Sequence, residues 1–251
     1  MNSASHELNQ AVPRLGVHDN MKILTVVPTR IELNALKKAF QEQGYNVESV
    51  VIGKKQIAYI PSLETTVALG GLGKTQFALH TQQLIDLEHW GLVICAGTAG
   101  ALVAGLGKGD VVISTETVEI VMPSKSDPPV LRRFHSQEGV LRQCRQAIQS
   151  EPAFRVLYGP IACGDEFVVK AEQRASIHKI SGALVVAMEG AGGASASQVS
   201  GVPFIEIRAV TDYANIMAVL DFFLNLNKAM QNLAHVVISL ACSSLEADRA
   251  E

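Results

Sequence analysis

The sequence lacks the features that mark metal-binding, disulfide-rich and nucleic-acid-binding proteins. Its four cysteines, at positions 95, 144, 163 and 242, are widely spaced and form no C-x-x-C pair, so neither a zinc site nor a disulfide framework is expected. The formal net charge of −3 gives no basic surface for phosphate backbones, so nucleic acid is not an expected partner. Scattered, reduced cysteines favour a cytoplasmic protein.

Long apolar runs are missing as well. No run reaches the roughly 18–20 residues of a membrane span, so a membrane is not an expected partner. Residues 1–20 lack the hydrophobic segment of a secretory signal, and we expect them to form a polar, poorly ordered extension. Hydrophobic residues make up 48% of the 251-residue chain, which is enough for one large core, so residues 21–251 are expected to form a single domain.

None of the seven histidines follows an apolar strand, which disfavours histidine acid–base catalysis and a Ser-His-Asp hydrolase. Carboxylates take such positions instead, because the apolar segment 185–190 carries Glu189 and the segment Phe204–Asp212 ends in Asp212. Ligands of open α/β sheets bind outside the carboxyl ends of strands, so both acids are candidates for chemistry. Each also has a structural alternative: Glu189 as a first-turn helix acid, and Asp212 as a loop cap or partner of Arg208.

Apolar periodicity predicts strands that alternate with helices. Strands are expected at residues 22–27, 65–69, 92–96, 110–120, 156–162, 185–189 and 204–212, with a hairpin at 47–52 and 56–59. Helices are expected after Thr29 up to Gly44, at 75–87, 138–150, 171–180 and 219–240 and between the last two strands, with a surface loop at 123–133. This alternation indicates the α/β class, with a mostly parallel sheet covered on both faces.

A glycine-rich segment at residues 70–74, Gly-Gly-Leu-Gly-Lys, is expected to form a turn between a strand and a helix. It fails the Walker A spacing, because Ala68 stands where that motif needs glycine, and it fails the dinucleotide fingerprint at Gln76. Two interpretations of the turn around Gly71 remain. It either only redirects the chain or brings backbone amides close to an anionic or polar ligand.

A second glycine turn is expected at residues 97–100, Gly-Thr-Ala-Gly, where Thr98 would either cap a helix or bond a ribose or phosphate oxygen. Thr29 and Glu32 have the spacing of a helix capping box. That structural interpretation of Glu32 is at least as strong as a catalytic one.

Taken in order, these segments resemble the nucleoside phosphorylase and nucleosidase family, and more closely its methylthioadenosine/S-adenosylhomocysteine nucleosidase branch. The likeness extends from Met21 to about Leu240 and rests on residues 21–33, 70–74, 93–102, 109–114 and 185–212. The resemblance implies a three-layer α/β/α fold around a central mixed, mostly parallel and partly barrel-like twisted sheet. It also implies a purine nucleoside as the ligand, no metal or organic cofactor, and a homo-oligomer, either a dimer or a hexamer.

The resemblance further implies roles for three acids. Asp212 would pass a proton to N7 of the leaving purine, Glu189 would bond the ribose hydroxyls, and Glu32 would activate the attacking water. Cleavage of an N-glycosidic bond builds positive charge on the ribose and negative charge on the base, which an acid and nearby carboxylates stabilise. We therefore expect a pKa of Asp212 raised by burial or by neighbouring acids.

Other positions match substrate contacts of the family. Phe167 and Val168 would line the base pocket, Met188 would pack on the sugar, and Thr98 and Arg208 would lie near the water and the ribose. The remaining predicted substrate contacts are Gly71, Gly97 and Thr211.

The reaction expected from this likeness is hydrolysis of an adenosine thioether, methylthioadenosine or S-adenosylhomocysteine, with release of adenine. Hexameric phosphorylases carry an arginine where Cys95 stands, which favours water over phosphate, while Arg30 keeps phosphorolysis as an alternative. Residues 28–32 look like the first loop of futalosine hydrolase, a second alternative. A non-catalytic nucleoside-binding or storage protein of the same fold is the third.

Two departures from the nucleosidase pattern leave the exact nucleoside open. Ala187 stands where the nucleosidases commonly carry an acid. An aromatic residue that usually covers the sugar or the thioether tail is expected to be replaced by an aliphatic one near Leu220.

Overall fold

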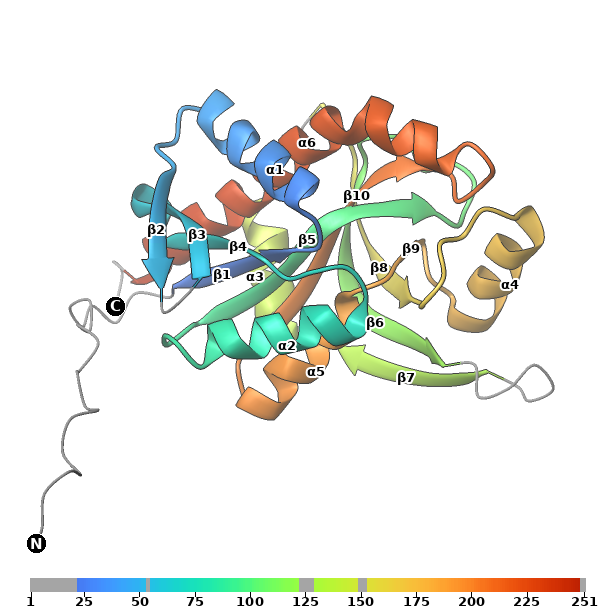
Figure 1. Ribbon diagram of the computed structural model, residues 1–251, viewed down its shortest axis with the longest axis horizontal. Helices are drawn as coiled ribbons and strands as arrows, with labels where there is room; N and C mark the ends of the chain where they lie inside the picture. Colours follow the sequence, from blue (N-terminus) through green and yellow to red (C-terminus); the bar gives the residue numbers. More distant parts are fainter. Residues whose placement is uncertain (1–21, 53–54, 122–128, 149–152, 249–251) are drawn as a thin grey trace, which may run out of the picture.

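The computed structural model describes residues 22–52, 55–121, 129–148 and 153–248, and the extension expected at residues 1–20 lies outside them (Figure 1). A ten-stranded mixed sheet lies between two layers of helices, which confirms the predicted α/β architecture. The strands are β1 Ile23–Val27, β2 Glu48–Ile52, β3 Lys55–Ile60, β4 Thr65–Leu69, β5 Leu92–Ala101, β6 Val111–Val121, β7 Val130–His135, β8 Val156–Cys163, β9 Val185–Ala187 and β10 Phe204–Asp212. The helices are α1 Arg30–Glu42, α2 Lys74–Ile85, α3 Glu138–Ala147, α4 Ala171–Ser181, α5 Gly190–Ser200 and α6 Ala218–Asp248, and a short 3₁₀ turn spans Pro61–Leu63.

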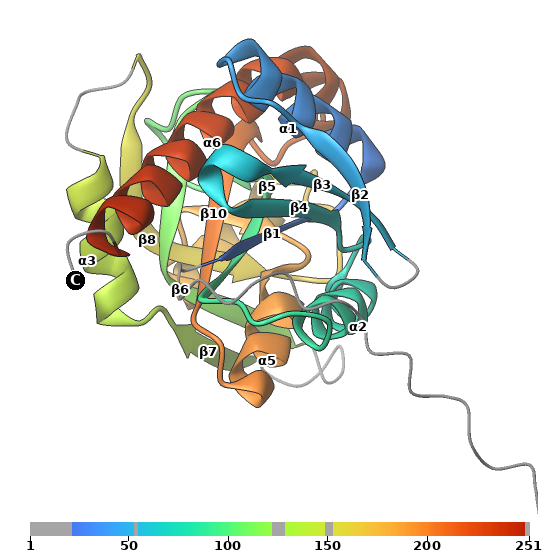
Figure 2. The same ribbon diagram turned by 90° about the vertical axis from the view of Figure 1, so that its left-hand side faces the viewer.

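The helices cover the sheet in two groups. Helices α1 and α6 pack on one face, and α2 and α5 pack together on the other (Figures 1 and 2). Strand β1 is buried along its whole length, as its continuous apolar sequence predicts for a strand covered on both faces. None of the helices in the described ranges combines the length and the apolar character that crossing a bilayer requires.

Five strands close into a ring of hydrogen-bonded neighbours. Strand β10 pairs with β5 in parallel and with β6 in antiparallel orientation, and β8 lies between β6 and β9. Strand β9 then returns to β5 in antiparallel orientation, which completes the ring. The acids Glu189 and Asp212 lie at the carboxyl ends of β9 and β10, and both strands pair with β5 at Gly100. The two strands run in opposite directions relative to β5, and closure of the ring brings their ends together.

Two segments expected as turns or loops are strand instead. Residues 97–100 do not form a glycine turn, because β5 continues through them and pairs with β10 from Gly97–Arg208 to Gly100–Asp212, with a register shift between Val210 and Asp212. Part of the loop expected at 123–133 forms β7, which pairs with β6 from Val130 to His135, while residues 122–128 lie outside the described residues. In both segments, long-range pairing with a neighbouring strand overrides the local turn composition.

Candidate active site

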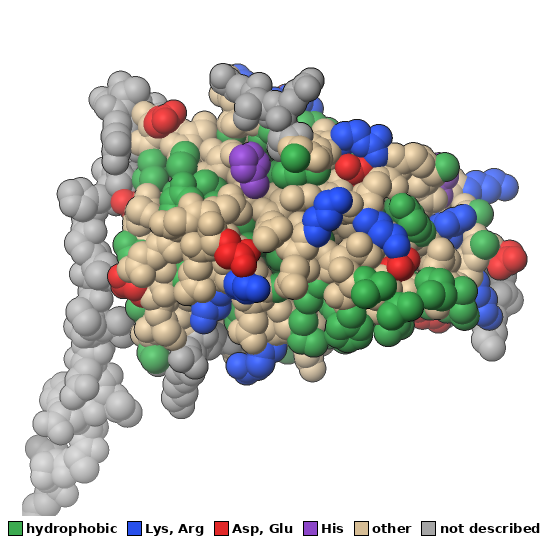
Figure 3. Space-filling view, turned by 90° about the horizontal axis from the view of Figure 1, so that it is seen from above, with side chains coloured by type: hydrophobic (Ala, Val, Ile, Leu, Met, Phe, Trp, Pro, Cys, Tyr) green, Lys and Arg blue, Asp and Glu red, His purple; other side chains and the backbone are tan. Residues whose placement is uncertain are grey.

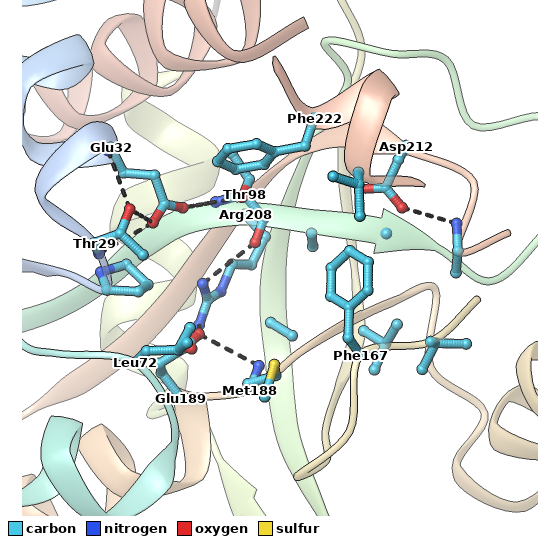
Figure 4. Close-up of a pocket in the computed structure, with 18 of the residues that line it drawn as sticks. Thr29, Glu32, Leu72, Thr98, Phe167, Met188, Glu189, Arg208, Asp212 and Phe222 are labelled. Atoms are coloured by element: carbon cyan, nitrogen blue, oxygen red, sulfur yellow. Dashed lines mark hydrogen bonds and ion pairs between the residues drawn. The ribbon is translucent and has the colours of Figure 1, made fainter. Parts of the chain in front are cut away.

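A cavity of about 440 Å³ opens where β5, β9 and β10 meet (Figure 4). Its lining includes all three acids singled out in the sequence, Glu32, Glu189 and Asp212. Of the other predicted site residues, those that line the cavity are Thr98, Phe167, Val168, Met188 and Arg208. These three carboxylates and the guanidinium of Arg208 thus lie in one cavity whose other walls are mostly apolar.

Glu32 is held at one end of the cavity by two threonines. The predicted capping box is confirmed, since Thr29 accepts from the backbone N–H of Glu32 and donates its own N–H and hydroxyl to Oε2 at 3.2 and 2.7 Å. Thr98 donates both its N–H and its hydroxyl to Oε1 at 2.9 Å. The side chain is almost fully buried, and burial raises the pKa of Glu32. The capping acid is thus also a cavity-lining acid, so the two interpretations of Glu32 do not exclude each other.

Arg208 lies at the centre of the cavity floor, between two glutamates, and is fully buried (Figure 4). Its Nη2 lies 3.1 Å from Oε2 of Glu189, and its Nε lies 2.8 Å from Oε1 of Glu206. It also donates to the carbonyl of Thr98 at 3.3 Å and to the sulfur of Cys95 at 3.2 Å. A buried charge needs such partners, and this guanidinium holds the carboxylate of Glu189 in a fixed orientation.

Glu206 was missed in the sequence analysis. It is fully buried, accepts a hydrogen bond of 2.6 Å from the hydroxyl of Thr117, and has its pKa raised by burial, which Arg208 opposes. Its spacing in the strand could have revealed it, since residues two apart on a strand point to the same face. A glutamate two positions before an arginine in an otherwise apolar strand predicts a buried ion pair.

In the turn at residues 70–74, Leu72 and Gly73 contact the cavity or one of its acids, whereas the predicted contact was Gly71. The backbone N–H of Gly73 donates to Oε1 of Glu189 at 3.2 Å, so the anion that the amide approaches is a side chain of the protein itself. Leu72 lines the cavity, whereas Gly71 is not among its described lining residues and lies close to Gln76 and His80. Both glycines have positive φ angles, 93° for Gly71 and 80° for Gly73, which glycine adopts without strain.

Asp212 lies away from Glu32, at the end of β10 (Figure 4). Its Oδ1 accepts from the N–H of Ala214 and its Oδ2 from the hydroxyl of Thr211, both at 2.9 Å. Burial raises the pKa of Asp212, and the nearby Asp221 raises it further, against the hydrogen bonds and Lys108. The predicted upward shift is thus confirmed in direction. Thr211 contacts this carboxylate and is not among the residues lining the cavity.

The start of α6 contributes one aliphatic and one aromatic side chain to the cavity. Leu220 is exposed and does not line the cavity, while Val219 and Phe222 do. Because α6 begins at Ala218, positions 219 and 222 fall on one helical face and turn toward the cavity together. The aliphatic residue that lines the cavity near Leu220 is thus Val219, and Phe222 adds an aromatic side chain one helical turn further on.

Cationic groups are scarce around the cavity. Arg208 is the one lysine or arginine among the described lining residues, and two glutamates already bind it. Arg30 lines a different cavity. Cys95 is buried beneath Arg208.

Gly97 lies behind the wall of the cavity, and its lack of a side chain is a packing requirement. A Cβ atom there would lie 2.7 Å from Nη1 of Arg208 and 3.0 Å from Oε1 of Glu32. We therefore expect Gly97→Ala to lower the free energy of unfolding by about 1–3 kcal/mol through overpacking, measured by denaturant titration. Gly139→Ala is the control, because a Cβ there meets nothing within 4 Å. Equal stability of both variants would contradict the packing assignment.

Comparison with known proteins gives consistent results. The phosphorylase superfamily matches residues 22–241. A 5'-methylthioadenosine/S-adenosylhomocysteine nucleosidase of Exiguobacterium sp. is 30% identical over 190 residues, which cover 72% of this chain and 82% of the relative. The nucleosidase of the same name from Neisseria meningitidis, solved with methylthio-immucillin-A, is 30% identical with a TM-score of 0.75, covering 88% of this chain and 98% of that one. Futalosine hydrolase of Helicobacter pylori is 25% identical with a TM-score of 0.77, covering 89% and 98%.

Proposed function

This chain belongs to the phosphorylase superfamily, and on that premise we propose that it is a purine nucleosidase. It hydrolyses the N-glycosidic bond of an adenosine thioether, methylthioadenosine or S-adenosylhomocysteine, and releases adenine. The observation that carries the proposal is the single cavity that collects Glu32, Glu189 and Asp212, with the pKa of Asp212 raised by burial. The relatives from Exiguobacterium sp. and Neisseria meningitidis named above support the same reaction.

In the proposed mechanism, each of the three acids acts on a different part of the reacting nucleoside or on the attacking water. Asp212 enters the reaction protonated and donates its proton to the departing purine, which would otherwise leave as an anion. Glu189 accepts hydrogen bonds from the ribose hydroxyls and, as a carboxylate, stabilises the oxocarbenium-like sugar. Glu32 orients a water molecule and accepts its proton as the new C–O bond forms.

Water is the proposed nucleophile because the described lining residues include no unpaired cation that would neutralise phosphate. A phosphate dianion requires cationic or N–H donors, and the guanidinium of Arg208 is occupied by Glu189 and Glu206. Glu32 and Glu189 would repel an anion at the same position. Hydrolysis therefore fits this set of charges better than phosphorolysis.

The rim of the cavity favours an uncharged 5′ substituent. Leu72, Phe167 and Val219 line it and are between 51% and 58% exposed, so an apolar tail would cover them from water. Futalosine is the second candidate substrate, because the Helicobacter pylori futalosine hydrolase is similar over most of its length. A carboxylate on futalosine, like the one on S-adenosylhomocysteine, would lack a free cation among the described lining residues, so methylthioadenosine is the substrate that this rim favours.

The test is chromatographic detection of free base after incubation with methylthioadenosine, S-adenosylhomocysteine, adenosine, inosine or futalosine, each with and without phosphate. Adenine released from a thioether without phosphate is the expected result. Hypoxanthine from futalosine alone would assign the protein to the sister reaction, and release only with phosphate would make it a phosphorylase. Binding of a nucleoside without release of any base would identify a non-catalytic binding protein.

The rate should depend on pH through Asp212. Its raised pKa keeps the proton at pH values where an ordinary aspartate has lost it, so kcat should fall as pH rises through the folded-state pKa. Asp221→Asn removes a negative charge that raises this pKa and leaves Lys108, which lowers it, so the alkaline limb of the kcat profile should move to lower pH. Profiles at fixed ionic strength measure the shift, and an unmoved limb would exclude Asp212 as the titrating acid.

We also propose that the protein is a homo-oligomer, a dimer in the first instance. Exposed apolar side chains gather beside the cavity, at Ile216, Met217, Leu220, Phe223 and Leu224. Hydrophobic side chains also line one edge of the face seen in Figure 3. Contiguous apolar surface of this kind marks protein–protein contacts. Light scattering should give at least twice the 26.9 kDa of one chain, and a mass of one chain at micromolar concentration would contradict it.

A further inference from the structure

A second cavity, of about 270 Å³, lies on the other side of α1 from the one already described. Four of its lining residues, Arg30, Leu33, Asn34 and Lys37, have the i, i+3, i+4, i+7 spacing of one helical face. Glu32 lines the first cavity from another face of the same helix, and the two cavities share no lining residue among the described parts of the chain.

The position of this cavity in the fold is one at which α/β proteins bind ligands. Strands β1 and β4 are parallel neighbours that end together, with Val27 opposite Leu69. The chain leaves β1 into α1 on one face of the sheet and leaves β4 into α2 on the other, as Figure 2 shows. The helices diverge at the carboxyl ends of the two strands, and a crevice of this kind is a topological switch point. Leu69 at the end of β4 and His80 on α2 line it.

The charges around the cavity are of one sign. Arg30 and Lys37 line it, and no aspartate or glutamate is among its described lining residues. Neither cation forms an ion pair with any residue in the described ranges. His80 adds a ring whose Nδ1 is buried with no hydrogen-bond partner in the same part of the chain. Two unpaired cations and an imidazole around one hollow attract an oxyanion.

We propose that this cavity binds a small phosphate-bearing ligand, with its phosphate oxygens held by Arg30 and Lys37 and hydrogen-bonded by Asn34. The wall opposite these groups is apolar, formed by Ile57 and Ala58 of β3 and Ala68 of β4. Such a wall accommodates the carbon skeleton of a phosphorylated sugar, whereas inorganic phosphate would fill only the cationic part. Both ligands, inorganic phosphate and a phosphorylated sugar, would bind through the phosphate group, and a binding measurement can distinguish them.

Isothermal titration of the full chain with inorganic phosphate and with ribose 5-phosphate, at one ionic strength, tests the proposal without relying on turnover. Lys37→Gln should weaken binding by about tenfold or more, because it removes one charge-assisted contact. Lys38→Gln is the matched control, since Lys38 is the next residue on α1, is exposed, and pairs with Glu42 instead. It should change the dissociation constant less than about twofold. Asn34→Asp, at an exposed position, should also weaken binding because it adds a negative charge to the cavity.

The outcomes separate cleanly. Tighter binding of ribose 5-phosphate than of phosphate identifies an organic phosphate as the ligand, and equal binding identifies the free anion. No binding of either probe at about 10 mM overturns the proposal, since it would place the affinity below that of a weak metabolite site. Equal losses in Lys37→Gln and Lys38→Gln also overturn it, because they would show a general attraction to α1. Binding of either probe that neither Lys37→Gln nor Asn34→Asp weakens would place the phosphate elsewhere on the protein and likewise overturn it.

Discussion

Replacement of Asp212 by asparagine is expected to lower kcat by about 10²–10⁴-fold while the nucleoside still binds. The amide has the shape of the carboxyl group but carries no acidic proton for the departing base. It can keep both local contacts, because its oxygen can accept from the N–H of Ala214 and its NH₂ group can donate to the hydroxyl of Thr211. Single-turnover release of free base measures the chemical step, and calorimetric titration with the substrate measures binding.

The free energy of unfolding of Asp212→Asn shows whether the variant loses activity because it lacks the proton or because its fold is damaged. An acid whose pKa is raised by folding stabilises the protein below its unfolded-state pKa and loses that contribution as pH rises through the folded-state pKa. Removal of the Asp212 carboxyl should therefore leave the free energy of unfolding at neutral pH unchanged or higher. A kcat within about tenfold of the original protein would remove Asp212 from the role of proton donor.

Replacement of Arg208 by methionine is expected to lower the free energy of unfolding by about 3–5 kcal/mol, because it leaves buried carboxylates without their cation. Glu189 and Glu206 both depend on this guanidinium, and neither side chain has appreciable exposure to water. The loss is a large part of the about 5–15 kcal/mol that a domain usually has. Denaturant titration measures it, and any folded fraction should have weakened catalysis because Glu189 loses its orientation.

Arg145→Met is the matched control. Arg145 pairs with Glu138 at 3.2 Å on the surface, where both side chains are about half exposed or more, so its removal should cost less than about 1 kcal/mol. Glu206→Gln combined with Arg208→Met should recover part of the stability, since one of the two unpaired carboxylates is removed. A loss for Arg208→Met as small as that for Arg145→Met would show that the buried cluster is not held together by its charges.

Local sequence patterns predicted the elements whose formation depends on their own residues. The strand Thr65–Leu69 was predicted at its observed bounds, and α1 begins at the predicted capping box of Thr29 and Glu32. Apolar periodicity and caps act within one turn or one strand, so they can be read without knowledge of the fold. The acids at the ends of β9 and β10 were found in the same way, as polar interruptions of apolar runs.

What the sequence did not predict depends on partners far along the chain. The segment 97–100 has the composition of a turn, yet it is extended because β10 pairs with it and Arg208 occupies the space above Gly97. Glu206 is another example, because its burial only makes sense next to Arg208 and Thr117. Phe222 faces the cavity because α6 begins at Ala218, which sets the direction of each side chain on the helix. Strand pairing, neutralisation of buried charges and the direction in which a helix face points depend on residues far apart in the sequence. A short stretch of sequence therefore does not predict them.

The closed ring of strands also means that the active site can form only late during synthesis of the chain. Its last member, β10, pairs with β5 and β6, which emerge from the ribosome much earlier, so the ring is a set of contacts of high sequence separation. Such high contact order slows folding, because distant segments must meet before their pairing stabilises them. Until β10 emerges, β5 and β6 present unpaired edges, which nascent chains bury poorly and which other chains can bind. The nascent protein therefore acquires Asp212 and Arg208 late, the cavity is complete only after α6 adds Val219 and Phe222, and chains that stall before residue 204 are expected to need chaperone protection.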